Sequence, residues 1–354
     1  MTAFWTEPDY DDHELVQLVR DEKRGLTAII AVHSTHLGQG AGGTRVWHYA
    51  NPKDAMRDAL RLSRGMSYKN ALAGLPMGGG KAVILADQDG TKTSQMLHAF
   101  AENVEALGGK YVTAADVGIS EADIVTMSEK TSYVSGLPVA DGASGGGDPG
   151  PHTALGIYQG IKAAVRQELG ADSLSGVHIA IQGTGSVGGG VARLAAADGA
   201  KLTLADINQA GAKALADELG GEVSDPDTIL STICDVLSPN ALGAILNEKS
   251  IPQLNTQIVA GGANNQLARP EHGELLAERD ILYAPDYVIN AGGIISVATE
   301  YLCRRDNIPC KIEDVHAHIA QIPARLEEIW GEAAASGLPS DVIADRMAQK
   351  LIGR

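Results

Sequence analysis

Six residues at positions 183–188 (GTGSVG) constrain the fold more than any other part of the chain. They follow an apolar run at 177–182 (VHIAIQ) that is typical of a strand, and they open a helix predicted over residues 186–198. In such a turn the first glycine permits the tight bend, the second lets a ligand approach the backbone, and the third lets helix and strand pack closely. The free amides at the start of the helix favour an anionic group. The motif therefore predicts a Rossmann-type dinucleotide-binding domain.

An acidic residue at the end of the next predicted strand indicates which dinucleotide. The strand covers residues 202–205 and ends at Asp206, about twenty residues after the first glycine of the motif. A carboxylate there accepts hydrogen bonds from ribose hydroxyls and repels a 2′-phosphate, so the pattern favours NAD over NADP. The predicted cofactor-binding residues of this region are Gly183, Thr184, Gly185, Ser186, Val187, Gly188 and Asp206.

Length and element order indicate two α/β domains. A chain of 354 residues exceeds the size at which one hydrophobic core keeps growing. Predicted strands and helices alternate on both sides of residues 141–151 (DGASGGGDPGP), a stretch typical of a crossing between domains. We expect an N-terminal α/β substrate and oligomerisation domain at 1–140 and a Rossmann-type NAD-binding domain at 141–329. Helices at about 330–354 are expected to pack back on the first domain.

Composition excludes several classes of function. The net charge of −16 disfavours a nucleic-acid partner, and no run of about twenty apolar residues suggests a membrane span. Three cysteines without metal-ligand spacing predict reduced thiols and no metal site. The acidic N-terminus lacks the basic and apolar regions of a secretory signal, so we expect a cytoplasmic protein.

Two lysines and an aspartate suggest the chemistry of the first domain. Lys81 follows three glycines (78–80), but Ala82 comes next and a strand follows, so this is not a P-loop. We interpret the glycines as a bend that admits a ligand to the backbone and aims Lys81 into a cleft. Should Lys69 and Asp116 lie nearby, neighbouring cations would lower each other's pKa, leaving one lysine as a neutral base. The alternative is two surface lysines and a loop aspartate.

Several long motifs carry a resemblance to a known family. They occur, in order, at residues 42–49 (GGTRVWHY), 58–84 (DALRLSRGMSYKNALAGLPMGGGKAVI), 111–118 (YVTAADVG), 183–188, 260–267 (AGGANNQL) and 283–298 (YAPDYVINAGGIISVA). The chain thereby resembles the leucine/phenylalanine/valine branch of the glutamate dehydrogenase-like amino-acid dehydrogenases. The resemblance implies a homo-oligomer whose subunits have two domains about a cleft, and NAD-dependent oxidative deamination of an L-amino acid to its 2-oxo acid and ammonia.

The resemblance also implies residue roles. Lys81 matches the family's catalytic lysine, which activates the attacking water, and Asp116 matches the aspartate that exchanges protons with the substrate nitrogen. Lys69 matches the lysine that binds the substrate carboxylate. Asn264 matches an asparagine that holds the substrate close to the nicotinamide, and Thr153 a threonine beside the nicotinamide amide.

The side-chain pocket that the resemblance implies is apolar, which argues against glutamate as substrate. Its residues would be Gly42, Met66, Met77, Ala114, Ile294 and Val297. The β-branched Ile294 and Val297 favour a leucine-, valine- or isoleucine-like side chain. Alternatives are a phenylalanine or other aromatic amino-acid dehydrogenase, a hydroxy-acid dehydrogenase, and a non-catalytic NAD-binding regulator.

Overall fold

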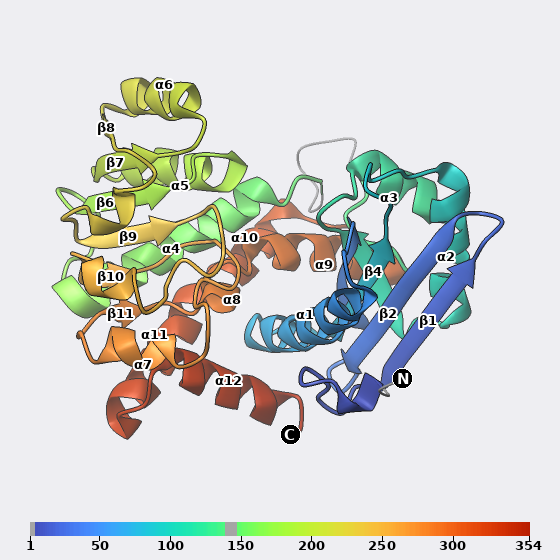
Figure 1. Cartoon of the computed structure of the whole chain (residues 1–354). Helices are drawn as coiled ribbons and strands as arrows, with labels where there is room; N and C mark the ends of the chain where they lie inside the picture. The colour runs from blue at the N-terminus through green and yellow to red at the C-terminus, as the bar shows by residue number, and fades with distance from the viewer. Residues whose placement is uncertain (1–3, 139–146) are drawn as a thin grey trace. The chain divides into compact units, whose positions relative to one another are not determined.

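The computed structural model describes residues 4–138 and 147–354, and the chain divides into two compact units. Unit 1 contains Met1–Asp148, Ser296–Ile312 and Ala348–Arg354, and unit 2 contains Pro149–Ile295 and Glu313–Met347 (Figure 1). Most of the glycine-rich stretch predicted to cross between domains, 141–146, lies outside the described residues. The expected cleft between the two domains stays a prediction.

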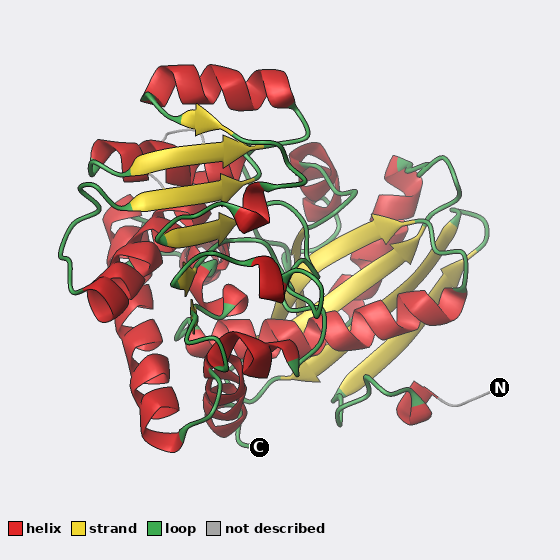
Figure 2. Ribbon diagram, turned by 60° about the vertical axis from the view of Figure 1, so that its left-hand side comes forward, coloured by secondary structure: helices red, strands yellow, loops and turns green. Residues whose placement is uncertain are grey.

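Unit 1 is built on a five-stranded mixed sheet. Its strands are β1 (Leu15–Asp21), β2 (Leu26–Ser34), β3 (Gly40–Trp47), β4 (Gly78–Leu85) and β5 (Tyr111–Ala115), in the spatial order β1-β2-β4-β3-β5. β1 and β2 form an antiparallel pair, β2 pairs antiparallel with β4, and β3 runs parallel to both β4 and β5 (Figure 2). The short helix η1 (Phe4–Thr6) precedes the sheet. Because β3 lies between β4 and β5, residues from three separate parts of the sequence meet at its end.

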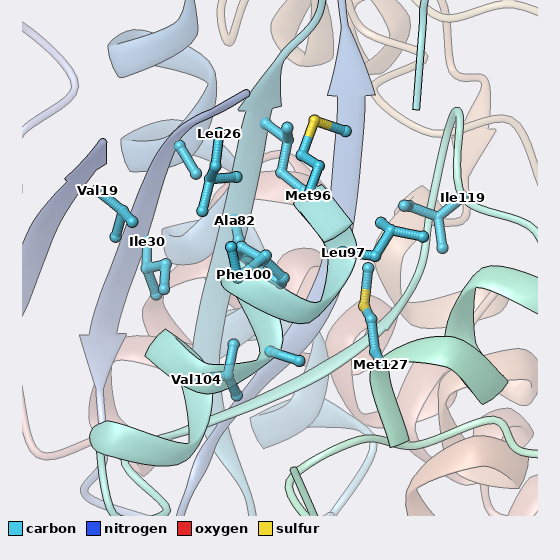
Figure 3. Packing of buried hydrophobic residues seen from close by; sticks show 14 of the residues in the cluster. Val19, Leu26, Ile30, Ala82, Met96, Leu97, Phe100, Val104, Ile119 and Met127 are labelled. Atoms are coloured by element: carbon cyan, nitrogen blue, oxygen red, sulfur yellow. The ribbon is translucent and has the colours of Figure 1, made fainter. Parts of the chain in front are cut away.

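Helices cover both faces of this sheet. Helices α2 (Ser94–Ala106) and α3 (Glu121–Ser128) cover one face, where Phe100, Leu97 and Met127 pack with Ile30 and Ala82 (Figure 3). Each fully buried large apolar side chain of this kind contributes roughly 1.5–3 kcal/mol to stability. The other face packs against the long helix α1 (Pro52–Leu72). Successive side chains of a strand point to opposite faces of the sheet, so the odd-numbered residues of β4 lie on the face that α1 covers. Lys81 is one of these residues.

Unit 2 has the strand order of a Rossmann fold. Its strands are β6 (His178–Gln182), β7 (Lys201–Ala205), β8 (Glu222–Val223), β9 (Val236–Pro239), β10 (Ile258–Val259) and β11 (Leu282–Tyr283). They are all parallel, in the order β11-β10-β9-β6-β7-β8. This is the doubly wound order, in which the direction of winding reverses between β6 and β9, and ligands bind outside the carboxyl ends of strands at that reversal. The predicted two-unit α/β fold with a Rossmann domain is confirmed.

The helices of unit 2 flank this sheet. They are α4 (Gly150–Leu169), α5 (Ser186–Ala197), α6 (Gln209–Leu219), α7 (His272–Ala277), α8 (Asp286–Ile289), α10 (Ile312–Ile319) and α11 (Ile322–Ser336), with short turns η2 (Ile229–Ser231) and η3 (Ile251–Gln253). Helices α9 (Gly292–Arg305) and α12 (Ser340–Leu351) each contribute several residues to both units, and the first residue of α10, Ile312, groups with unit 1. Helix α11 packs against α4 and α8 of unit 2. Helices at about 330–354 were expected to pack back on the first domain, but of this segment only Ala348–Arg354 groups with unit 1.

Two element lengths follow from packing and from local sequence. Helix α1 continues to Leu72, because its buried face extends to that residue. Between Ile312 and Ser336 the chain forms two helices, because Pro323 lies in the first turn of the second. Within the described residues, no helix combines the length and apolar character needed to cross a bilayer.

Candidate active site

Lys81 lies in the middle of the sheet of unit 1 and its side chain is almost fully buried. Only 7% of the side chain is exposed, and its Nζ donates to Asp116 Oδ2 at 2.7 Å. Asp116 follows β5 directly, and β5 and β4 are the two neighbours of β3. The register explains the contact, because Thr44 of β3 is aligned with both Ala82 and Ala115. Two groups that are 35 residues apart in sequence thus form one buried ion pair.

A second cation contacts the same carboxylate. Arg45 on β3 donates from Nε to Asp116 Oδ2 at 3.1 Å, and from Nη1 to Asp58 Oδ2 of α1 at 3.0 Å. The Arg45 and Asp58 side chains are both less than a quarter exposed. Lys81, Arg45, Asp116 and Asp58 therefore form a network of two cations and two anions on the α1 face of the sheet. We call these four residues the charged cluster.

Burial and charge act on both members of the ion pair. Burial lowers the pKa of the Lys81 ammonium; the Asp116 carboxylate opposes this shift, and the nearby Arg45 guanidinium adds to it. Burial alone would raise the pKa of Asp116, but Lys81 and then Arg45 outweigh burial, so the pKa of Asp116 is lowered. The cluster thus favours an anionic Asp116 beside a lysine that loses its proton more readily than an exposed one.

The glycines before Lys81 serve the packing of the sheet. They are the first three residues of β4, and a Cβ at Gly78 would lie 1.9 Å from the carbonyl oxygen of Ser34. A Cβ at Gly79 would lie 2.1 Å from the backbone nitrogen of Ser67 on α1, and one at Gly80 would lie 2.6 Å from the Tyr111 ring. The prediction that residues 78–80 form a bend open to a ligand is therefore wrong. They are glycines because α1 and the neighbouring strands approach them too closely for side chains.

Helix α1 carries Lys69 over the same face. The helix runs antiparallel to β4, with Ala55 and Ala59 packed near Val83 and Ser67 against Gly79. Helical spacing puts residues 58, 66 and 69 on one stripe. At one end of that stripe Asp58 contacts Arg45, and further along Met66 Cγ lies 3.0 Å from the Cβ position of Gly42. Lys69 is half-buried and stands one turn beyond Met66.

The glycine motif of unit 2 has the geometry of a dinucleotide-binding turn. Gly183 has φ of 88°, and a Cβ there would lie 2.9 Å from the backbone of Asn240, which follows β9. A Cβ on Gly188 would lie 1.9 Å from the Gly183 carbonyl oxygen, so the helix packs tightly on the turn. A Cβ on Gly185, in contrast, would meet nothing within 4 Å, and among the described residues no side chain caps the start of α5. The turn therefore leaves open space beside free helix N-terminal amides, which suits a diphosphate.

Asp206 lies directly beside this turn. Its Oδ2 accepts from the Thr184 backbone N–H at 2.7 Å and its Oδ1 from the Asn208 backbone N–H at 2.8 Å. These hydrogen bonds, the Thr184 one foremost, lower the pKa of the Asp206 carboxyl. An anionic carboxylate retains acceptor capacity for hydroxyl groups beyond the two amides.

Two family models match the chain. Residues 13–133 match "Glu/Leu/Phe/Val dehydrogenase, dimerisation domain", and residues 204–348 match "Glutamate/Leucine/Phenylalanine/Valine dehydrogenase". A leucine dehydrogenase from Geobacillus stearothermophilus is 44% identical over 342 residues, covering 96% of this chain and 91% of the relative. The chain belongs to the Glu/Leu/Phe/Val dehydrogenase family. It is therefore an amino-acid dehydrogenase, an oxidoreductase.

Further similarities within the family span almost the whole chain. A valine dehydrogenase from Streptomyces albus is 41% identical, with 97% of this chain and 93% of the relative covered. The solved structure of L-tryptophan dehydrogenase from Nostoc punctiforme superimposes with a TM-score of 0.84 at 38% identity, covering 96% of each chain. The family resemblance inferred from the motifs is confirmed.

The two remaining polar site residues predicted for this dehydrogenase lie in unit 2. Asn264 is exposed, and its Oδ1 accepts from Asn290 Nδ2 at 2.8 Å. Thr153 stands in the first turn of α4, where its hydroxyl donates to the Pro149 carbonyl oxygen at 2.8 Å. A Cβ on Gly293 would lie 2.5 Å from the Thr153 hydroxyl oxygen, so α9 begins directly against this turn.

The predicted pocket residues of the dehydrogenase occupy different settings. Gly42 and Met66 are in contact distance, and Ala114 lies one position along β5 from the partner of Gly42. Met77, just before β4, is only 1% exposed. Ile294 and Val297 are three residues apart on α9, but Ile294 groups with unit 2 and Val297 with unit 1. Gly42 is also required by packing, since a Cβ would lie 1.9 Å from the Gly80 carbonyl oxygen.

Sequence reasoning missed two members of the charged cluster, Arg45 and Asp58. Both occur in the motifs that carry the family resemblance, but neither was singled out. A signal was present in the sequence, since Arg45 is the one charged residue of the segment 40–47 (GAGGTRVW). Charged residues are rarely buried unless they are paired, so such a position points to a partner elsewhere in the fold.

Proposed function

We propose that this dehydrogenase oxidatively deaminates a small apolar L-amino acid, leucine-, valine- or isoleucine-like, with NAD as hydride acceptor. The observation that carries the proposal is the buried contact between Lys81 Nζ and Asp116 Oδ2 at 2.7 Å. An amine that can take a proton from water and a carboxylate that can exchange a proton with the substrate nitrogen are the two groups that the deamination requires. Relatives named leucine and valine dehydrogenase support the substrate class.

The cofactor site supports NAD on three grounds. The open space at Gly185 and the uncapped start of α5 fit a diphosphate. The position of Asp206 beside Thr184 fits ribose hydroxyls. Its lowered pKa keeps the carboxylate charged, so it would repel the 2′-phosphate of NADP. Gly183, Thr184, Gly185, Ser186, Val187, Gly188 and Asp206 would hold the cofactor, with Thr153 and Asn264 near the nicotinamide.

The chain's own groups would then act on protons. When bound, NAD supplies the acceptor for the hydride that leaves the substrate α-carbon. Lys81, as a neutral amine, would take a proton from the water that attacks the imine carbon. Asp116 would exchange the proton on the substrate nitrogen, so that the carbon–nitrogen bond breaks and ammonia leaves. Lys69 would bind the substrate carboxylate through its charge.

The side-chain preference rests on the apolar character of the proposed pocket. Gly42, Met66, Met77, Ala114, Ile294 and Val297 offer no partner for a second carboxylate, which disfavours glutamate. One methylene changes selectivity by only about 1–3 kcal/mol, so related aliphatic amino acids are expected to compete. An aromatic substrate is the second candidate, because the tryptophan dehydrogenase structure is 38% identical.

We also propose that the protein is a cytoplasmic homo-oligomer. The family model for residues 13–133 is described as a dimerisation domain. Unit 1 exposes large apolar side chains that a partner would cover, with Leu18 of the edge strand β1 at 68% exposed and Trp47 at 54%. Cys234, Cys303 and Cys310 are free thiols, as expected in a reducing compartment.

A substrate panel on two matched proteins tests the function. The wild type is assayed with L-leucine, L-valine, L-isoleucine, L-phenylalanine, L-glutamate and the matching hydroxy acids, each with NAD and with NADP. We expect turnover with aliphatic amino acids and NAD. Lys81→Ala is expected to lose turnover by at least about a thousandfold while NAD binding is retained, because a general base contributes roughly 10²–10⁴-fold and its ion pair is also lost.

Any one of three results would contradict the proposal. Turnover of Lys81→Ala at the wild-type rate would remove Lys81 from the chemistry. Preference for a hydroxy acid, or NAD binding without any turnover of the wild type, would exclude deamination. A preference for L-phenylalanine would shift the conclusion to the aromatic candidate.

A further inference from the structure

Arg45 is held at two points within the charged cluster. Its Nε donates to Asp116 Oδ2 at 3.1 Å, which is the same oxygen that Lys81 contacts at 2.7 Å. Its Nη1 donates to Asp58 Oδ2 on α1 at 3.0 Å. A planar guanidinium bound at both ends keeps one orientation. Its charge is therefore fixed beside the Lys81–Asp116 pair.

Asp58 is itself anchored, which makes the arrangement rigid. Tyr49 donates its hydroxyl to Asp58 Oδ2 at 2.8 Å, and Arg61 Nη2 donates to Asp58 Oδ1 at 3.1 Å. The Arg45 side chain is 23% exposed and that of Asp58 19%, so solvent screens these charges less than it screens surface pairs. Arg61, at 49% exposed, lies on the outer side of the cluster.

We infer that Arg45 is a positioning residue of the deamination, which orients the Asp116 carboxylate and keeps a fixed positive charge beside the Lys81 amine so that Lys81 is available as a neutral base. The inference rests on the proposed function, because it presumes that Lys81 and Asp116 exchange protons with water and substrate. Arg45 acts through these two residues, whereas Lys81 and Asp116 are the proposed catalytic residues.

The charges around Lys81 lead us to expect opposite shifts of its pKa in two variants. Among the described residues, the charged groups that act most strongly on Lys81 are Asp116, Arg45 and Asp58, and Arg45 is affected most by Asp116, Asp58 and the Tyr49 hydroxyl. The Arg45 cation disfavours the ammonium form of Lys81, whereas the Asp58 carboxylate favours it. Removal of Arg45 should therefore raise the pKa of Lys81, and neutralisation of Asp58 should lower it.

The pH profile of kcat/KM with L-leucine and NAD measures this directly. Its acidic limb reports deprotonation of the essential base in the free enzyme. In Arg45→Gln we expect this limb to move to higher pH by about one unit, the scale on which a neighbouring charge shifts a pKa. In Asp58→Asn we expect it to move to lower pH. Arg45→Lys restores the charge and should bring the limb back towards the wild-type position.

Arg61→Gln is the matched control. It removes an arginine that donates to Asp58, whereas within the described part of the chain Asp116 is contacted by Arg45 and Lys81. We expect the acidic limb of Arg61→Gln to coincide with that of the wild type. A merely structural role of Arg45 would lower activity in Arg45→Gln and Asp58→Asn alike and would not move their limbs in opposite directions. Thermal unfolding of each variant checks that it is folded.

The outcomes separate the inference from the proposed function. The inference is overturned if the acidic limb of the pH profile stays in place in Arg45→Gln and Asp58→Asn, or if it moves in the same direction in both variants. If Arg45→Gln does not fold, Asp58→Asn decides, since a limb that stays in place or moves to higher pH overturns it. Wild-type turnover of Lys81→Ala would instead overturn the proposed function. Loss of turnover in Lys81→Ala with unmoved limbs in the other variants removes only the role of Arg45.

Discussion

Individual glycines serve two different purposes in this dehydrogenase. Gly42, Gly79 and Gly188 are packing positions, because a Cβ at each would lie within 2.1 Å of a backbone atom. Gly185 is different, since its φ of −67° is open to any residue and a Cβ would meet nothing within 4 Å. Packing within the described structure does not require a glycine at position 185, which agrees with the diphosphate site proposed beside it.

This difference predicts contrasting effects of two alanine substitutions. Gly185→Ala should leave the free energy of unfolding within about 0.5 kcal/mol of wild type, because no clash arises. The same methyl group would occupy the space proposed for the diphosphate, so NAD affinity should fall at least about tenfold. Chemical denaturation and NAD titration measure the two effects.

Gly188→Ala provides the comparison for that prediction. A Cβ there would lie 1.9 Å from the Gly183 carbonyl oxygen, so we expect lower stability together with weaker NAD binding. An unchanged NAD dissociation constant in Gly185→Ala would mean that the cofactor does not approach the backbone at this residue.

Helix α1 is the element on which the proposed site of unit 1 depends most. It contributes Asp58 to the charged cluster, and it carries Met66 and Lys69 along the same stripe. The helix begins with Asn51, whose side chain accepts from the Lys53 backbone N–H at 3.1 Å, followed by Pro52 in the first turn. Its position is then set by the glycines of β4, which let Ser67 approach the strand backbone.

The cap of α1 predicts a measurable effect on stability. Asn51→Ala removes the side-chain acceptor from the first turn and should cost about 1 kcal/mol of unfolding free energy. Asn51→Ser retains a capping oxygen and should cost little. Urea denaturation followed by circular dichroism compares the three proteins. Equal midpoints for Asn51→Ala and Asn51→Ser would show that the cap does not contribute to the stability of the fold.

At the scale of the whole chain, a buried histidine joins parts of unit 1 that are distant in sequence. His33 on β2 is fully buried, and its Nδ1 lies 2.8 Å from the Ser67 hydroxyl of α1. Its Nε2 lies 3.0 Å from Asp11 Oδ2 and 2.8 Å from Arg354 Nη1. Arg354 also donates to the backbone oxygens of Asp11, Asp12 and His33. One side chain thus connects residues from both ends of the described chain.

This histidine predicts how stability depends on pH. Burial, and then the charge of Arg354, lower the pKa of His33 from 6.5 to about 4. Because the unfolded chain binds a proton that the folded chain excludes, stability is highest above pH 6.5 and falls as the pH drops towards about 4. The loss attributable to His33 is at most about 3 kcal/mol. Unfolding free energies measured across this window test the prediction.

His33→Gln supplies the comparison. The substitution removes the titrating group, so its unfolding free energy should change less with pH over the same window than that of the wild type. Some pH dependence is expected to remain, because burial also lowers the pKa of His13. Parallel curves for the two proteins would show that His33 does not contribute to acid sensitivity.

Local patterns determined those parts of the protein that are contiguous in the chain. The turn at residues 183–188, the strands and helix on either side of it and the acid at 206 were all predicted, and unit 2 has the corresponding strand order. Such a motif is readable because its backbone geometry depends on residues within one strand–turn–helix. Lys69, Lys81 and Asp116 could be nominated as candidates in the same way, from residue type and neighbouring glycines.

The tertiary structure decided which of those candidates meet and what surrounds them. Lys81 and Asp116 contact each other because β3 lies between β4 and β5, and no local pattern specifies that order of strands. The same strand order brings Arg45 into contact with Asp116. It also places the glycines before Lys81 against α1 and the neighbouring strands, at positions where a ligand site had been expected. Pairings between distant strands depend on packing across the whole sheet, so the charged cluster became visible only in the folded chain.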